Sequence, residues 1–189
     1  MKTFFFSDPH FGHTNIIKFQ NRPFQTATEM DEKIITNWNS VVSTDDQVYL
    51  LGDVSFYDLE KTKEILDCLN GKIYLILGNH DRYINMELMD RFETISSYPM
   101  LFQEVFLLSH EPVFLTAESP FCNIHGHIHN RSLESPLYIN VSAESIDYTP
   151  ISFAGVKKIE GVKDRMRMYS DLKRKHKELI DERHVEVPA

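Results

Sequence analysis

KIYLILGNHD, residues 72–81, joins a run of apolar residues directly to a cluster of polar ones. Short apolar runs that end in Gly, Asp, Asn or Ser are typical of buried β-strands. The same pattern recurs at five other places along the chain. These are TFFFS (3–7), QVYLLGD (47–53), EVFLLSH (104–110), FCNIHGH (121–127) and LYINVS (137–142). The sequence therefore predicts short buried strands, most of which end in polar side chains.

Helical patterns separate the first of these strands. Met30, Ile34 and Trp38 recur at helical spacing within residues 29–42, and Thr28 is the expected N-cap. Apolar stripes of the same kind predict helices over residues 60–70 and 84–92. An order of β-α-β-α-β-α followed mostly by strands favours a layered α/β domain, with parallel early strands and a second sheet formed by the later ones.

The composition is that of an ordinary globular protein, since 42% of the 189 residues are hydrophobic and 25% are charged. The net charge of −8 argues against extended binding of duplex DNA, because Lys and Arg side chains supply most of that affinity. A phosphate-bearing substrate is still compatible with this charge, because a bound metal can supply positive charge locally.

The cysteine content and the lengths of the apolar runs indicate the cellular compartment of the protein. Cys68 and Cys122 are too few for a disulfide framework, and we expect both to be small buried hydrophobic residues. The N-terminal apolar run is too short for a signal peptide, and no stretch approaches the ~20 apolar residues of a membrane span. We therefore expect a reduced, cytoplasmic protein with no membrane partner.

The last part of the chain has a different character. From about Lys157 onward the sequence is highly charged, and Met166, Tyr169 and Leu172 give it only a narrow apolar stripe. We expect one domain over residues 1–156, and over residues 157–189 a charged helical extension that docks on it or frays. A helix that binds a partner or forms an oligomer is the alternative, and the oligomeric state stays open.

Polar side chains follow the predicted strands where ligand sites of α/β sheets form, outside the carboxyl ends of the strands. Buried polar groups cost free energy unless they are paired or bound to metal, so five such strand ends indicate a metal site rather than a satisfied core network. Nitrogen and oxygen donors suit Mn²⁺, Fe, Zn²⁺, Co²⁺ or Ni²⁺, and their number suits two ions that share a carboxylate. The polar residues that follow the predicted strands are Asp8, His10, Asp53, Asn79, His80, His110, His127 and His129.

Five motifs lie at the predicted strand ends, namely DPH (8–10), GD (52–53), GNHD (78–81), SH (109–110) and GHIH (126–129). In this order they resemble the signature blocks of the calcineurin-like metallophosphoesterase superfamily. Within that superfamily, SDPHFGHTNII (7–17) is similar to the small stand-alone phosphoesterases of bacteria and phages. The resemblance implies a four-layer α/β/β/α sandwich, in which two mixed sheets are flanked by helices.

The resemblance also implies two divalent transition metal ions, with Mn expected first and Fe, Zn, Ni or Co as alternatives. His125 matches no ligand position, and we expect it to support the ligands from behind or to have a structural role. The ligands implied for one ion are Asp8, His10, His129 and the bridging Asp53. Those implied for the other ion are Asp53, Asn79, His110 and His127.

The activity implied is hydrolysis of a phosphodiester or phosphomonoester by a metal-bound hydroxide. His80 would stabilise the transition state or protonate the leaving oxygen, and Asp81 would support the loop or orient His80. A nucleotide, a nucleic-acid end or another small phosphoester is the expected substrate. VSFYD (54–58), which follows GD, lacks the Asp-Arg-Gly with which the phosphoprotein phosphatases place an arginine at the phosphate. Its absence argues against dephosphorylation of proteins. A non-catalytic scaffold for protein interactions is the alternative function.

Contacts to the substrate are harder to assign. We expect the specificity wall in the segment between Asp8 and Asp53, which includes KFQNRPFQTATEM (18–30) with Phe24, because it is the largest stretch between consecutive motifs in the first half. His13 and Asn15 could reach the substrate phosphate, or they could stabilise their loop as a pair. Three arginines near the motifs could clamp a phosphate oxygen, namely Arg22, Arg82 and Arg131.

Overall fold

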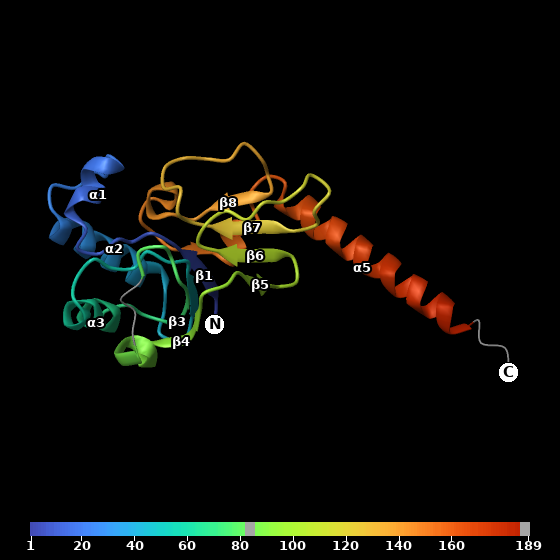
Figure 1. Ribbon diagram of the computed structural model, residues 1–189, viewed down its shortest axis with the longest axis horizontal. Coiled ribbons are helices and arrows are strands. Elements are labelled where there is room, and N and C mark those ends of the chain that lie inside the picture. The colour runs from blue at the N-terminus through green and yellow to red at the C-terminus, as the bar shows by residue number, and fades with distance from the viewer. Residues whose placement is uncertain (82–85, 186–189) are drawn as a thin grey trace.

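The computed structural model describes residues 1–81 and 86–185, and it contains two β-sheets (Figure 1). The first sheet has the strand order β4-β3-β2-β1-β9, and the second has the order β5-β6-β7-β8. The strands of the first sheet are β1 (Thr3–Phe6), β2 (Gln47–Leu50), β3 (Lys72–Ile76), β4 (Phe92–Ser96) and β9 (Ile151–Ser152). Those of the second are β5 (Met100–Phe102), β6 (Phe106–Ser109), β7 (Cys122–His125) and β8 (Tyr138–Asn140).

Both sheets are mixed. β1 to β4 run parallel, as the alternation of strands and helices predicts, and β9 joins β1 in the antiparallel direction. In the second sheet β6, β7 and β8 are parallel, and β5 is antiparallel to β6. The predicted class of two mixed sheets flanked by helices is therefore confirmed. The helices are α1 (Thr14–Phe19), α2 (Ala27–Val41), α3 (Leu59–Asp67), η1 (Met86–Arg91), η2 (Ala143–Ile146), α4 (Phe153–Val156) and α5 (Val162–Val185).

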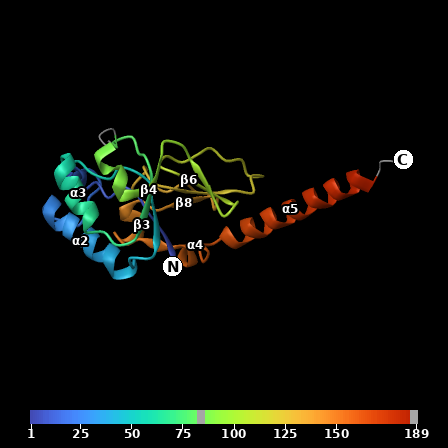
Figure 2. The same cartoon turned by 90° about the horizontal axis from the view of Figure 1, so that it is seen from below.

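The layers explain why the first strand is apolar throughout. Successive side chains of a strand point to opposite faces. Phe4 and Phe6 therefore pack in the core beneath α2 and α3, whereas Phe5 packs in the core between the two sheets. Figure 2 shows α2 and α3 on one side of the first sheet and the second sheet on the other. A strand buried on both faces reads as a continuous apolar run.

The predicted helix over residues 29–42 is confirmed, but its start was placed two residues too late. Thr26, not Thr28, is the N-cap of α2, and its hydroxyl accepts a hydrogen bond from the backbone N–H of Glu29. Glu29 also accepts a bond from the backbone N–H of Gln25, which ties the entering chain to the first turn. The predicted stripe is correct, because Trp38 and the other core residues of α2 are fully buried.

The predicted helix over residues 84–92 is only partly correct. Ile84 lies outside the described residues. Residues Met86–Arg91 form a short 3-10 helix, and Phe92 begins strand β4 beside β3. Pairing with the edge of β3 outweighs the helical pattern at this point, since the segment FETIS (92–96) contains three residue types that favour strands.

One cysteine prediction is wrong. Cys122 is buried in β7, as expected, but Cys68 is exposed because it is the C-cap residue of α3, where the helix meets solvent.

The chain ends in a long helix that projects away from both sheets (Figure 1). Its first turns are docked, because Val162 is buried in the inter-sheet core and Met166 and Tyr169 pack against it.

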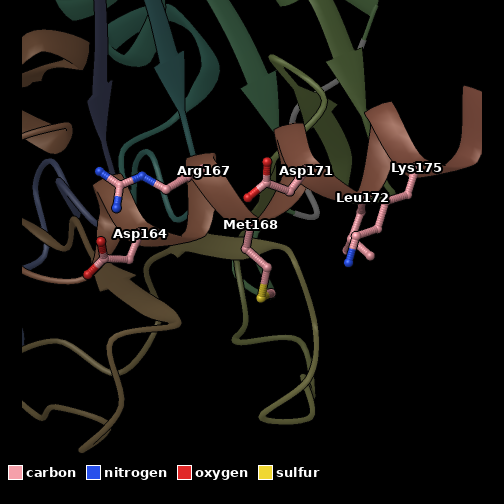
Figure 3. A pocket seen from close by; sticks show the side chains of 6 residues that line it. All are labelled: Asp164, Arg167, Met168, Asp171, Leu172 and Lys175. Atoms are coloured by element: carbon pink, nitrogen blue, oxygen red, sulfur yellow. The ribbon is translucent and has the colours of Figure 1, made fainter. Parts of the chain in front are cut away.

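The domain boundary expected at residue 156 stays a prediction, and residues 186–189 lie outside the described part. No described helix is long and apolar enough to cross a membrane. Figure 3 shows the residues that line a surface pocket along α5, namely Asp164, Arg167, Met168, Asp171, Leu172 and Lys175.

The two thiols are expected to react very differently. Burial raises the pKa of the Cys122 thiol to about 11, so little thiolate forms there and the reagent has no access. We expect a disulfide reagent such as DTNB to modify only Cys68 in the native protein, and Cys122 only after unfolding. The control variant Cys68→Ser should show no native reaction. A rapid reaction in that variant would contradict the burial of Cys122.

Candidate metal centre

The ends of five strands from both sheets converge on one place. β1, β2 and β3 lead into Asp8, Asp53 and Asn79, while β6 and β7 lead into the predicted histidine ligands. Two groups of side chains form there, and within each group one ligand atom per residue lies within 4.8 Å of the others. The first group is Asp8, His10 and His129, and the second is Asp53, His110 and His127.

Asp53 lies between the two groups. Its Oδ2 atom is 3.5 Å from Nε2 of His10 and also 3.5 Å from Nε2 of His110. Its other oxygen accepts a hydrogen bond of 2.9 Å from the backbone N–H of His80. One carboxylate oxygen therefore faces both groups, which is the arrangement that a shared ligand requires.

Asn79 joins the second group. Its Oδ1 atom lies 2.9 Å from Nε2 of His110 and 3.0 Å from Nδ1 of His127. An amide oxygen is a suitable ligand for a divalent ion, so the structure brings all seven predicted ligands into two adjoining sets.

The residues fit a divalent metal. Asp8 Oδ1 and His10 Nε2 are buried, and neither has a hydrogen-bond partner within the described part of the chain. A buried polar atom without a partner costs free energy comparable to a lost hydrogen bond or more. A cation bound between these atoms would satisfy both lone pairs, and the donor set of carboxylate, amide and imidazole suits such a cation.

Burial and neighbouring groups determine the charge of each side chain in the site. Burial strongly lowers the pKa of His10, to about 2, so this imidazole is neutral, as a metal ligand must be. Burial would also lower the pKa of His110, but the hydrogen bond to Asp53 and the nearby Asp8 carboxylate raise it to about 9. Burial would raise the pKa of Asp53, but His110 outweighs that effect and holds the pKa at about 2. A metal that binds His110 must therefore displace a proton from this ion pair.

The predicted ligands occupy a rare backbone conformation. Five of them have positive φ angles, between 53° and 69°. For a residue other than Gly this conformation costs about 1–2 kcal/mol, and such strain gathers at functional sites. The turns fold each side chain back over the strand end, so that alternate residues of DPH and HIH reach the same centre. The five residues are Asp8, His10, Asp53, His127 and His129.

Two glycines of the motifs are required because other residues of the site approach their backbone too closely for a side chain. A Cβ atom on Gly126 would collide with the side chains of Ser7 and Asp8. Gly52 has a φ of +88°, and a Cβ there would lie 2.7 Å from the ring of His110. These positions therefore exclude other residues for reasons of space and conformation.

Asp81 fixes the loops that carry the site. Its Oδ2 atom accepts bonds of 2.7 Å from the backbone N–H groups of Asp53 and Gly78, and its Oδ1 atom accepts one of 2.8 Å from Val54. Both oxygens are thus engaged by the backbone, which favours loop support over orientation of His80. The His80 side chain itself is exposed, and its ring centre lies 5.8 Å from that of His10.

Glu144 is a residue of the site that sequence reasoning missed. It lies in η2, and Nδ1 of His129 donates a hydrogen bond of 3.1 Å to its Oε1 atom. A carboxylate in this position fixes the tautomer of a histidine ligand and leaves the other ring nitrogen free for the metal. No motif marks Glu144, because its proximity to His129 arises only from the tertiary fold.

Arg22 binds Glu144 rather than solvent. Its guanidinium donates bonds of 2.8 Å and 2.7 Å to Glu144, and bonds of 2.8 Å to the backbone oxygens of Asp8 and Pro9. With only 4% of its surface exposed, Arg22 has no donor free for a substrate, so the expected phosphate contact does not fit its placement. Arg22 instead joins the DPH loop to the carboxylate behind His129.

The remaining candidates fall in different places. Nδ1 of His13 lies 3.2 Å from Nδ1 of His10, so His13 adjoins the site. Asn15 is exposed on α1, and Arg131 is exposed with its Nε 3.4 Å from the backbone oxygen of Ile128. Arg82 lies outside the described residues. Phe24 is buried in the core beneath α2, and the specificity wall expected of its segment stays a prediction.

His125 belongs to neither group of ligands among the described residues. It is fully buried at the end of β7, and its Nδ1 lies 2.9 Å from the backbone oxygen of Gly126. This placement agrees with the structural role expected for it.

Comparison with family models identifies one family, and similar proteins occur in an archaeon, a phage and a bacterium. The family model described as calcineurin-like phosphoesterase matches residues 1–184. An uncharacterized protein of Methanocaldococcus jannaschii is 37% identical over 90% of this chain and 98% of its own length. The gene 66 protein of Mycobacterium phage L5 is 34% identical over 54% of this chain and 50% of its own. The crystal structure of a protein of unknown function from Aquifex aeolicus is similar, with a TM-score of 0.67 and 28% identity over 84% of this chain and 98% of that one.

The contact between Glu144 and His129 predicts an effect on metal affinity. We expect Glu144→Gln to bind divalent metal about 10- to 100-fold more weakly, because the amide no longer holds the His129 ring by a charged acceptor. Isothermal titration calorimetry of the metal-free protein measures this directly. Glu104→Gln is the matched control, since it removes an exposed ion pair with Lys173. Equal metal affinities in Glu144→Gln and the native protein would contradict the role of Glu144.

Proposed function

The chain belongs to the calcineurin-like phosphoesterase family of metal-dependent phosphoric ester hydrolases, and we propose that it hydrolyses a small phosphodiester or phosphomonoester at a centre of two divalent ions. The candidate substrates are a nucleotide, the end of a nucleic acid and another small phosphoester. Mn²⁺ is the metal expected first, and Fe, Zn²⁺, Ni²⁺ or Co²⁺ are alternatives with the same donor preference.

The position of Asp53 carries this proposal. A single carboxylate oxygen placed equally far from His10 and His110 suits two ions that share a ligand. Asp8, His10 and His129 would complete the first site, and Asn79, His110 and His127 the second. Two bound ions supply positive charge at a phosphoryl group and increase the acidity of water.

The residues around the ions would position the ester and move a proton. His80 lies at the open side of the site, and its backbone is tied to the shared carboxylate of Asp53. Its imidazole can donate a proton to the leaving oxygen, which is the role of a general acid. Asp81 contributes indirectly, because it holds the loops of Asp53 and Gly78 in register.

Electrostatics favours a small substrate. Residues 1–156 contain ten Lys and Arg against twenty-one Asp and Glu, so the body of the protein is strongly acidic. A long polyanion would be repelled by this surface, whereas a single phosphate can be attracted by the ions alone. The charge therefore supports an ester whose phosphate reaches the centre without further phosphate contacts.

The first test is hydrolysis by the metal-loaded protein. We expect the Mn²⁺-loaded protein to hydrolyse p-nitrophenyl phosphate or bis-p-nitrophenyl phosphate, to lose this activity in EDTA, and to regain it when Mn²⁺ is restored. Release of p-nitrophenol measures the rate. If the metal-loaded protein is inactive on both esters, the proposal fails and the alternative of a non-catalytic scaffold is favoured.

A pair of variants tests the division of roles. His80→Ala is expected to lower the turnover number about 100- to 10,000-fold while metal content stays at about two ions per chain, because His80 would move a proton and bind no metal. Asp53→Asn is expected to lower the metal content at both sites. Plasma mass spectrometry measures the metal, and His176→Ala, an exposed histidine of α5, is the control. Loss of metal in His80→Ala would disprove its assignment.

A further inference from the structure

An aromatic surface adjoins the candidate metal centre, and we call it the aromatic ledge. It consists of His13, Phe19 and Phe56, which come from α1 and the turn before it and from the loop after β2. The rings of His13 and Phe56 are stacked, with their centres 3.9 Å apart and their planes 18° apart. Phe19 stands at the edge of His13, at 6.4 Å and 79°.

The ledge reaches the reacting part of the site. The Phe56 ring lies 5.2 Å from that of the predicted ligand His10, and the two planes are 19° apart. It also lies 5.1 Å from the ring of His80. A group that rested on the ledge would thus sit next to a phosphate held by the ions, within the length of one nucleoside.

Both phenylalanines of the ledge expose much of their apolar surface. Phe56 is 41% exposed and Phe19 is 71% exposed. Single exposed apolar residues are common and need no explanation. Here, however, two phenyl rings and an imidazole are grouped beside the same strand ends.

The fold does not need the Phe56 ring to hold its loop. The backbone N–H of Phe56 donates to the backbone oxygen of Phe11, and that of Phe11 donates to Val54. Asp81 binds the N–H groups of Asp53 and Val54 in the same loop. The ring is therefore carried on a fixed backbone, with little conformational entropy to lose when a ligand stacks on it.

We propose that the aromatic ledge stacks the base of a nucleoside phosphoester whose phosphate binds at the metal centre. This inference rests on the proposed phosphoesterase function and narrows its substrate class to nucleotides and nucleic-acid ends. Stacking on an aromatic ring tolerates every base, because each base has a π face. The ledge thus selects for a base without reading its identity, and it selects against phosphosugars and other esters that lack an aromatic group.

The test compares binding of two ligands that differ only in the base. One is a phosphonate analogue of AMP, and the other is the corresponding ribose phosphonate without a base. Their phosphorus–carbon bond resists hydrolysis, so calorimetry with the Mn²⁺-loaded protein measures affinity whether or not the protein turns over esters. We expect the nucleoside phosphonate to bind about 5- to 100-fold more tightly than the base-free one.

Variants of Phe56 separate stacking from simple packing. Phe56→Ala and Phe56→Leu are expected to reduce the preference for the base to about twofold or less, because neither has a π face, whereas Phe56→Trp should preserve it. Leu172→Ala is the control, since Leu172 is 46% exposed on α5 and should leave the preference unchanged.

The outcomes distinguish the two proposals. If the native protein binds both phosphonates equally, or if Phe56→Ala keeps the full preference, the ledge is not a base-binding site, even where p-nitrophenyl esters are hydrolysed. If the preference depends on Phe56 but no ester is hydrolysed, the ledge binds bases and the proposed hydrolysis fails.

Discussion

The ligand atoms around Asp53 are buried, and both sheets and the loops between them hold these atoms in place. Asp53 Oδ2 faces two groups of imidazole and carboxylate donors, and two donor atoms of the first group have no hydrogen-bond partner among the described residues. Such a cluster is unfavourable in an ordinary core. It persists because backbone contacts over-determine its position, with Asp81 bonded to three N–H groups and Arg22 bonded to the carbonyls of the DPH loop.

Neither sheet could build this centre alone. β1, β2 and β3 supply Asp8, Asp53 and Asn79 from one sheet, and β6 and β7 supply histidines from the other. The shared core between the sheets, where Phe5 meets residues of β6 and β7, therefore sets the distance between the two halves of the site. A loss of packing in that core would change metal geometry even though no ligand had been altered. Stability and function are therefore coupled through this layer.

The strand ends could be read from the sequence because their signal is local. An apolar run followed at once by Asp or His can be recognised without a structure. The two sheets and the parallel order of the early strands could be predicted from the order of such runs and of the helical patterns between them. Glu144, Arg22 and Phe56 carry no such signal. Glu144 approaches His129 from a 3-10 helix, Arg22 is buried by the fold around it, and the Phe56 ring stacks on a residue from a distant loop. The prediction of a helix up to residue 92 failed for a similar reason, because sheet pairing determined the start of β4 at Phe92.

The acidic excess of residues 1–156 determines how the phosphate and the rest of the substrate are recognised. With an excess of acidic residues, the surface offers little to attract phosphate, so the positive charge has to come from bound ions at one point. Recognition beyond that point then depends on uncharged contacts. The aromatic ledge meets this requirement, since stacking neither needs cations nor weakens with salt as phosphate contacts do. It follows that salt should weaken capture of the phosphate far more than the preference for a base, which makes the two contributions separable in one molecule.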